Sequence, residues 1–196
     1  MKFYSIHHPN REWGDYSDTL FDGMASRDEQ SGLLMLKRTG PFVPPISFPS
    51  GIVVTDAFRA MLEASKLTSF SFQPVIKEHI VTLDWDQWDL EAKEPEFYPD
   101  SGEPEDYILE GQHSPETAEQ MPQLWELVVK GTAHVERVID KSARYGVALF
   151  LLVSTWNGDD FFRAPDVGYY YVTETAKAWL ESQAPEFVAF KAVDTK

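Results

Sequence analysis

An α+β fold is the prediction for this chain of 196 residues, and three observations support it. The composition, with 43% hydrophobic and 25% charged residues, is that of an ordinary globular protein. Strand patterns outnumber helical ones, since seven or eight candidate strands accompany only two clear amphipathic helices. The two helices also lie in two similar segments, each with a strand pattern on either side. Helices and antiparallel strands in one core are the arrangement that these patterns favour.

An internal repeat relates residues 54–75 to residues 172–193 at an offset of 118 positions. Seven of the 22 aligned positions are identical, and two more are alike in charge. The shared apolar and polar order indicates two copies of one structural unit. The identical pairs are Val54/Val172, Thr55/Thr173, Ala60/Ala178, Leu62/Leu180, Glu63/Glu181, Phe72/Phe190 and Val75/Val193.

Each copy predicts a strand, a helix and a second strand. A β-favouring run ends at Thr55 in the first copy and at Thr173 in the second, and an acidic residue follows at once. A threonine hydroxyl can cap a helix N-terminus, and an acid in the first turn stabilises the helix dipole. Apolar residues then recur at i, i+3 and i+4, which is helical spacing. The predicted strand-helix-strand units cover about 51–76 and 169–193.

Further strands are expected outside the repeat, at 3–6, 33–36, 79–85 and 147–153. Residues 125–129 and 133–139 are expected to form a hairpin across Lys130-Gly131-Thr132. The resulting organisation has an N-terminal subdomain (1–83), an acidic connecting segment (84–126) and a C-terminal subdomain (127–196). The same elements could also form one compact domain.

The charge of the chain is concentrated in residues 84–126. This segment holds fourteen acidic residues and one lysine, whereas the rest of the chain is nearly neutral, and the whole chain has a net charge of −15. Proteins that bind nucleic acid or adsorb to membranes need clustered cations. We therefore expect this protein to belong to neither class. The longest apolar run, 146–153, is too short to span a bilayer.

Three interpretations of the acidic segment remain open. It could be a solvated insertion, a face that binds a cationic partner, or a metal site, although the spacing of its acids misses the pattern of a calcium loop. Tryptophan and tyrosine lie among the acids, which favours the partner-binding face. The candidate partner-binding residues are Asp84, Trp85, Asp86, Trp88, Asp89, Glu91, Glu96, Tyr98, Asp100, Glu103, Glu105, Asp106 and Tyr107.

Motifs of known catalytic chemistry are absent from the sequence. There is no cysteine, no zinc-binding histidine motif, no nucleophile elbow and no phosphate-binding glycine loop. Asp159-Asp160 follows a predicted turn at Asn157-Gly158, and an ion pair with Arg163 is its simplest explanation. We therefore predict no catalytic residue, no metal ligand and no cofactor.

A family resemblance covers about a third of the chain. The runs from Gly158 to Arg163 and from Tyr171 to Glu174, followed by Leu180-Glu181, resemble the C-terminal region of a myxobacterial-type immunity-protein family of bacterial polymorphic-toxin systems, first described as a domain of unknown function. Residues 54–75 resemble the same kind of unit. The resemblance implies a non-enzymatic cytoplasmic protein that binds a cognate toxin, and it identifies no contact residue.

Two functions follow as hypotheses. The first is an immunity protein whose acidic face occludes a basic toxin surface, such as the active-site cleft of a nuclease. The second is a carbohydrate-binding protein or a glycoside hydrolase, because aromatic residues and carboxylates suit sugar stacking and acid catalysis. No signal-peptide pattern begins the sequence, so a cytoplasmic location is expected.

Overall fold

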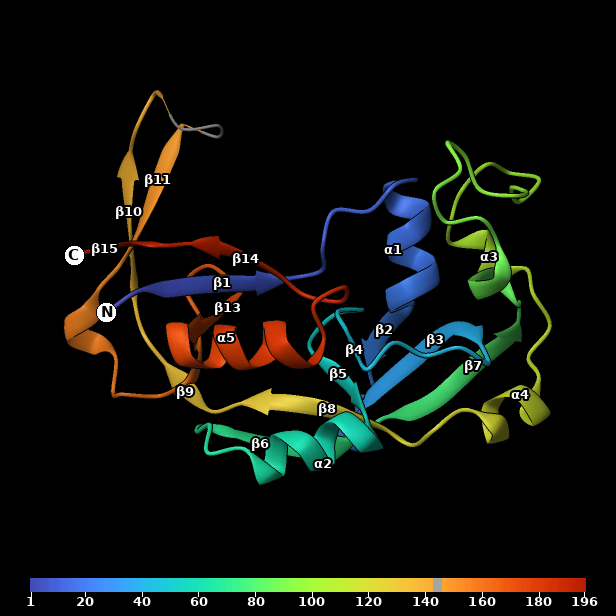
Figure 1. Cartoon of the computed structure of the whole chain (residues 1–196), viewed down its shortest axis with the longest axis horizontal. Coiled ribbons are helices and arrows are strands. Elements are labelled where there is room, and N and C mark those ends of the chain that lie inside the picture. The colour runs from blue at the N-terminus through green and yellow to red at the C-terminus, as the bar shows by residue number, and fades with distance from the viewer. Residues whose placement is uncertain (143–145) are drawn as a thin grey trace. The chain divides into compact units, whose positions relative to one another are not determined.

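The computed structural model describes residues 1–142 and 146–196 (Figure 1). Helices and strands are both present throughout, and the predicted α+β class is confirmed. The chain forms two compact units. Unit 1 comprises Met1–His7, Ser65–Ser71 and Val128–Lys196, and unit 2 comprises His8–Ala64 and Phe72–Leu127. Each unit thus combines separate stretches of chain, and the expected division at 84 and 126 stays a prediction.

In its described residues, unit 1 contains two sheets, one α-helix and one 3-10 helix. The strand order is β14-β1-β13-β12-β9 in the larger sheet and β10-β11-β15 in the smaller. Phe3, Leu151, Phe162 and Tyr171 lie at the centre of its core. The elements are β1 (Phe3–His7), β9 (Gly131–Thr132), β10 (Val135–Ile139), β11 (Val147–Leu151), a 3-10 helix (Val153–Thr155), β12 (Phe161–Ala164), β13 (Tyr169–Thr173), α5 (Glu174–Gln183), β14 (Ala189–Ala192) and β15 (Asp194–Thr195).

Unit 2 contains the remaining sheets, with strand orders β2-β3-β7 and β4-β5-β8-β6, four α-helices and one 3-10 helix. The chain passes between the units inside β6 and β8. The elements are α1 (Asp15–Asp22), β2 (Met24–Arg27), β3 (Leu34–Gly40), β4 (Ile46–Ser47), β5 (Val53–Thr55), α2 (Asp56–Ala64), β6 (Phe70–Pro74), β7 (Ile76–Thr82), a 3-10 helix (Trp85–Gln87), α3 (Asp106–Leu109), α4 (Pro115–Gln120) and β8 (Leu124–Val129).

Both predicted strand-helix-strand units are present, as β5-α2-β6 and β13-α5-β14. The threonines begin the helices as expected: Thr55 Oγ1 accepts from the Phe58 N–H, and Thr173 Oγ1 accepts from the Ala176 N–H. Each bond satisfies one of the unpaired amides at a helix N-terminus.

A strand from elsewhere in the chain lies between the two strands of each copy. In unit 1, β1 is antiparallel to both β13 and β14. In the first copy, β8 lies between β5 and β6 and is antiparallel to β5. On its other side, the Leu124 carbonyl accepts from the Val75 N–H, and the Lys130 N–H donates to the Ser69 carbonyl, which is also an antiparallel order. Both copies are therefore split β-α-β units, in which a helix joins two parallel strands across an inserted one.

The register of the inserted strands extends the repeat to residues that the sequence comparison did not align. Val54 pairs with Trp125 of β8, and its counterpart Val172 pairs with Tyr4 of β1. An aromatic ring therefore occupies the same place in both copies, beneath the helix that crosses over it.

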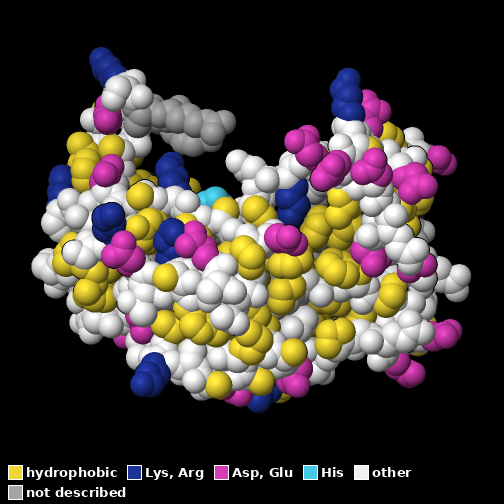
Figure 2. Space-filling model, viewed as in Figure 1, with side chains coloured by type: hydrophobic (Ala, Val, Ile, Leu, Met, Phe, Trp, Pro, Cys, Tyr) yellow, Lys and Arg dark blue, Asp and Glu magenta, His cyan; other side chains and the backbone are white. Residues whose placement is uncertain are grey.

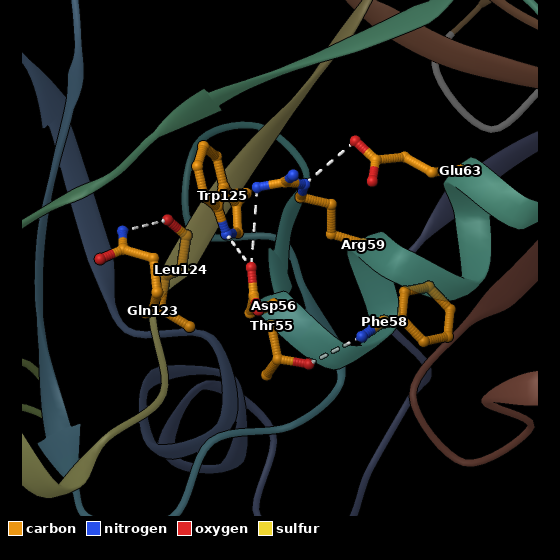
Figure 3. A network of polar contacts seen from close by, with 8 residues as sticks. All are labelled: Thr55, Asp56, Phe58, Arg59, Glu63, Gln123, Leu124 and Trp125. Atoms are coloured by element: carbon orange, nitrogen blue, oxygen red, sulfur yellow. Dashed lines mark hydrogen bonds and ion pairs between the residues drawn. The ribbon is translucent and has the colours of Figure 1, made fainter.

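In the first copy, Arg59 of α2 covers this ring (Figure 3). Its Cζ atom lies 3.9 Å from the centre of the Trp125 ring, and its Nε atom lies 3.1 Å from Glu63 Oε1. The Trp125 indole N–H donates to Asp56 Oδ1 over 2.8 Å, as Figure 3 shows. A cation over an aromatic face contributes about 0.5–1 kcal/mol at an exposed site. These contacts fix the helix on the sheet.

The second copy repeats the arrangement with lysine in place of arginine. Lys177 Nζ lies 5.2 Å from the centre of the Tyr4 ring and 5.4 Å from that of Phe190. The same ammonium lies 2.5 Å from Glu181 Oε1. The Glu63/Glu181 identity and the Arg59/Lys177 likeness therefore preserve one contact between helix and sheet. In both copies a cation lies over an aromatic ring of the sheet and pairs with a glutamate of its own helix.

The expected hairpin across Lys130-Gly131-Thr132 is wrong. The strands form, but β10 pairs with β11, and β9 pairs in parallel with β12. Glycine at position 131 allows the backbones of β9 and β12 to approach closely, because a Cβ atom there would lie 2.4 Å from the Phe161 carbonyl oxygen. The strand expected at 79–85 is displaced toward the N-terminus, since β7 ends at Thr82 and Trp85 begins a 3-10 helix.

Asp159 and Asp160 connect loops of unit 1 through hydroxyl groups. Asp160 accepts from the backbone N–H and hydroxyl of Thr68 and from the hydroxyl of Thr173. Asp159 accepts from the Ser69 hydroxyl. These donors take the place that the sequence analysis gave to Arg163. Separately, within the described ranges, no helix combines the length and apolarity needed to cross a bilayer.

Substitution of either capping threonine tests the equivalence of the two copies. We expect Thr55→Ala to lower the free energy of unfolding by about 1 kcal/mol, because it leaves a helix amide unpaired. Thr173→Ala should cost at least as much, since it also removes the hydroxyl that donates to Asp160. Urea denaturation measures the change. Thr175→Ala, at an exposed position in the first turn of α5, is the matched control and should change stability by less than about 0.5 kcal/mol. Equal losses in all three variants would contradict the capping role.

Candidate partner-binding surface

The predicted partner-binding residues all lie in unit 2. They occupy the 3-10 helix Trp85–Gln87, the start of α3, and the irregular stretch between them. We call residues 88–105 the acidic loop. Figure 1 shows this loop beside α3 and away from α4, which carries the later acids of the same segment.

Trp85 attaches the start of this surface to the hydrophobic core of unit 2. Its side chain is fully buried, and its indole N–H donates to Thr39 Oγ1 over 3.0 Å. The Phe21 and Phe42 rings contact it edge-on, with centres 4.5 and 5.1 Å away. Burying an indole removes roughly 150–250 Å² of surface from water, which contributes at most about 4–6 kcal/mol. Trp85 therefore holds the start of the acidic segment in the core.

The partner-binding prediction is corrected at Trp85 and Tyr107. Tyr107 is 8% exposed and belongs to the same hydrophobic cluster as Trp85, together with Leu20 and Ile108. Because neither ring reaches the surface, neither can contact a partner. Trp88 is half-buried, and Tyr98 is exposed. The aromatic residues thus divide between a buried foundation and a smaller exposed set.

Three aromatic side chains hold the backbone of the acidic loop in place. Each donates a hydrogen bond to a loop carbonyl, which satisfies the polar end of a ring whose body is packed. Burial raises the pKa of Tyr107 to about 12, so its hydroxyl stays protonated and can donate at neutral pH. The loop is therefore ordered without regular secondary structure. The donor and acceptor pairs are Trp13 with Ala92, Tyr16 with Gly102, and Tyr107 with Phe97.

The carboxylates of the segment face outward. Of the fourteen acids between 84 and 126, eleven are exposed and two, Glu105 and Asp106, are half-buried. Glu126 is buried and paired with Arg27 at 2.8 Å. Figure 2 shows the acidic side chains gathered over the acidic loop and α3. The exposed predicted acids are Asp84, Asp86, Asp89, Glu91, Glu96, Asp100 and Glu103.

This arrangement concentrates negative potential on a fixed scaffold. Like charges repel one another, and the potential of such a surface attracts cationic molecules from a distance. Because the loop is already ordered, binding would not have to fix its backbone, which lowers the entropic cost of association. Phe97, adjacent to Tyr98, is exposed on the same loop and was missed by the sequence analysis, which considered only tryptophan and tyrosine as contacts.

A separate pocket of unit 2 has a volume of about 360 Å³. Its lining includes His8, Asp18, Asp22, Phe48, Ser50 and Glu105. His8 Nδ1 lies 3.1 Å from Asp18 Oδ1. The sequence analysis missed Asp18 and Asp22, although their spacing of four residues places both on one face of α1.

The pocket contains a buried carboxylate with a perturbed pKa. Asp22 is 4% exposed, and this burial raises its pKa even though Oδ1 accepts from the Phe48 N–H over 3.1 Å. The guanidinium of Arg38 is fully buried, and burial lowers its pKa to about 10, opposed by the charge of Asp22. These two opposite charges partly compensate each other inside the unit.

His8, Asp18 and Asp22 have the donor atoms of a metal site. One donor atom from each lies within 4.8 Å of the others. Two carboxylates and an imidazole suit transition metals. However, Arg11 Nη1 lies 3.7 Å from Asp18 Oδ1, and its charge weakens the attraction of the group for a cation. The expectation that the chain has no metal ligand stays a prediction.

Comparison with known proteins adds no relative. No protein-family model, no curated protein and no solved structure matches the chain. The resemblance to the immunity-protein family therefore remains a prediction from the residues that carry it, and any function must be argued from the geometry of the surface.

Amide exchange can test the fixation of the acidic loop. Tyr16→Phe and Tyr107→Phe each remove one hydroxyl donor and keep the ring, so each should weaken the loop locally by about 1 kcal/mol. We expect roughly fivefold faster hydrogen exchange at amides near Gly102 and Phe97, respectively. Tyr170→Phe in β13 is the control. Unchanged exchange in both variants would show that the hydroxyls do not hold the loop.

The pH dependence of stability should report the buried Asp22. A carboxyl group whose pKa is raised on folding contributes stability that is fully present below its ordinary value of 3.8 and is lost as the pH rises through the raised pKa. Asp22→Asn removes this contribution and keeps an acceptor for the Phe48 amide. The unfolding free energy of the wild type relative to D22N should therefore fall as the pH rises above 3.8.

Asp28→Asn provides a control of opposite sign for this experiment. Hydrogen bonds from Ser31 lower the pKa of Asp28, so its contribution is present above 3.8 and lost as the pH falls. Chemical denaturation at a series of pH values measures both differences. A wild-type advantage over D22N that grows with pH would refute the assignment.

Proposed function

We propose that this protein is an immunity protein, which binds a cognate bacterial toxin and blocks it by covering a basic surface. The observation that supports the proposal is the acidic loop, whose backbone is held by buried and half-buried aromatic side chains while its carboxylates face solvent. A merely solubilising insertion would not need such fixation, because charge alone keeps a surface solvated. The family resemblance of the two repeat copies supports the same function.

Charge determines the class of partner in this proposal. An ordered surface with many carboxylates and one lysine repels nucleic acid and anionic lipid, and it attracts a cationic protein surface. Toxins that act on nucleic acid have basic clefts, and an acidic loop can occupy such a cleft in place of the polyanion. A nuclease is therefore the toxin that best fits the proposal, with inhibition in the cytoplasm and no catalysis by the protein itself.

A second candidate function, carboxylate-based carbohydrate binding or hydrolysis, is supported by the pocket. Donor atoms of Asp18 and Asp22 lie within 4.8 Å of each other, so the two carboxyl groups are close enough to act on one bond, as the pair about 5–5.5 Å apart does in retaining glycosidases. Sugar stacking also needs an exposed aromatic face beside the carboxylates, and the aromatic residue that lines the pocket, Phe48, is half-buried. The binding function is therefore preferred, and an assay of aryl-glycoside hydrolysis with wild type and D22N distinguishes the two.

Charge reversal on the acidic surface tests the immunity function. The cognate toxin is to be sought by pull-down among the products of adjacent genes. The quadruple variant Asp84→Lys, Asp86→Lys, Asp89→Lys and Glu91→Lys should bind that toxin more weakly, chiefly through a slower association rate. We expect at least a tenfold loss at low salt and a smaller loss at high salt. Surface plasmon resonance measures binding, and survival of cells that express the toxin measures protection.

The control for this variant reverses acids of the same segment that lie away from the loop. Glu116→Lys with Glu119→Lys, both exposed on α4, should affect binding less than the loop variant does. Unchanged protection by the quadruple variant would overturn the placement of the contact on residues 84–91, which comprise the 3-10 helix and the start of the acidic loop. Absence of binding by the wild type to that toxin would overturn the immunity function.

A further inference from the structure

Two neighbouring aromatic side chains project from the acidic loop. Phe97 is 49% exposed and Tyr98 is 43% exposed. Leu90 on the same loop is 41% exposed. Large apolar side chains at the surface are individually common, but three on one short ordered loop offer apolar area for contact with another protein.

The two exposed rings pack against buried and half-buried aromatic side chains of unit 2. The centre of the Phe97 ring lies 4.6 Å from that of Trp88 and 6.1 Å from that of Tyr107. The Tyr98 ring meets Tyr16 edge-on, with centres 4.9 Å apart. The hydroxyl of Tyr107 also holds the backbone carbonyl of Phe97. Both rings therefore have fixed orientations before any partner arrives.

Acids surround the pair along the loop, at Glu94, Glu96 and Asp100, all of them exposed. Desolvation by neighbouring atoms raises the pKa of Tyr98, and the negative charge of Glu94 raises it further. An apolar centre with a charged rim is the usual anatomy of a protein-protein contact. Apart from the exposed Lys93, the charged residues of this rim are acidic, so the complementary surface should carry positive charge around an apolar side chain.

We propose that Phe97 and Tyr98 are the aromatic anchor of the partner-binding surface, and that they receive a basic protein segment. A lysine or arginine of that segment lies beside the Tyr98 ring with its charge toward the surrounding carboxylates, and an apolar side chain packs against Phe97. This inference rests on the proposed function for the identity of the partner. It extends that function by naming the residues that determine how long the complex lasts.

The carboxylates and the aromatic rings should contribute to different steps of binding. Exposed carboxylates act at long range and mainly raise the association rate, and salt screens them. Rigid aromatic rings exclude water only on contact, so their loss acts mainly on the dissociation rate. The anchor and the acids should therefore respond differently to mutation and to salt.

The first experiment measures binding kinetics with the toxin that the pull-down identifies. Phe97→Ala with Tyr98→Ala should raise Kd by roughly 30-fold or more through faster dissociation, at low and high salt alike. Phe97→Leu with Tyr98→Phe keeps apolar contact and a ring, and it should recover most of the affinity. Tyr169→Ala, which removes a 54% exposed ring from unit 1, is the matched control. Circular dichroism establishes that each variant is folded.

The second experiment tests the anchor without the toxin. The probes are two synthetic twelve-residue peptides, one of lysine and leucine and one of glutamate and leucine, with the same leucine positions. The wild type should bind the lysine peptide and not the glutamate peptide. The Phe97→Ala, Tyr98→Ala variant should bind the lysine peptide at least tenfold more weakly, although it keeps every carboxylate of the loop.

The outcomes separate this inference from the proposed function. If the toxin binds the alanine variant and the wild type equally, the anchor is overturned and the immunity function stands. If the wild type fails to bind the toxin, the immunity function falls, and the lysine peptide alone decides the anchor. Equal binding of that peptide to both forms, or no binding to either, overturns the anchor.

Discussion

Burial of the Trp85 indole is the constraint on which the acidic surface depends. The segment that follows carries too many like charges to collapse by itself, and an unanchored chain of that composition would remain solvated and extended. The indole packs between Phe21 and Phe42 and thereby ties the first turn of the segment to the core. Tyr107 does the same where the loop meets α3. Apolar burial at both ends therefore holds in place a loop that electrostatic repulsion would otherwise open.

The two split β-α-β units show how a repeat can persist while the chain around it changes. Thr55 and Thr173 begin the helices, and an aromatic residue on the inserted strand lies under the helix cation in each copy. The inserted strands themselves come from different places in the chain, Leu124–Val129 after the first copy and Phe3–His7 before the second. The contacts between helix and sheet are thus shared by the copies, and the connectivity is not.

Sequence patterns were sufficient for the features that depend on local interactions. Caps and helical spacing predicted α2 and α5, and charge counting located the acidic segment. Features that depend on distant partners were missed or wrong. Gly131 resembles a turn residue in the local sequence. Its actual role, a close approach to Phe161, depends on the pairing of β9 with β12, which no local pattern reveals. Likewise, no local pattern distinguishes the buried Trp85 from the exposed Phe97, since both stand among acids and their burial is decided by residues far along the chain.

The position of β1 determines when unit 1 can be completed during synthesis. This strand is made long before β13 and β14, between which it lies, so it has no partners in its sheet until residues near 170 and 190 have left the ribosome. Unit 2 needs nothing beyond Leu127. Pairings between residues so far apart in sequence close large loops and form late. The acidic surface can therefore be folded while the strand at the N-terminus still waits for its neighbours.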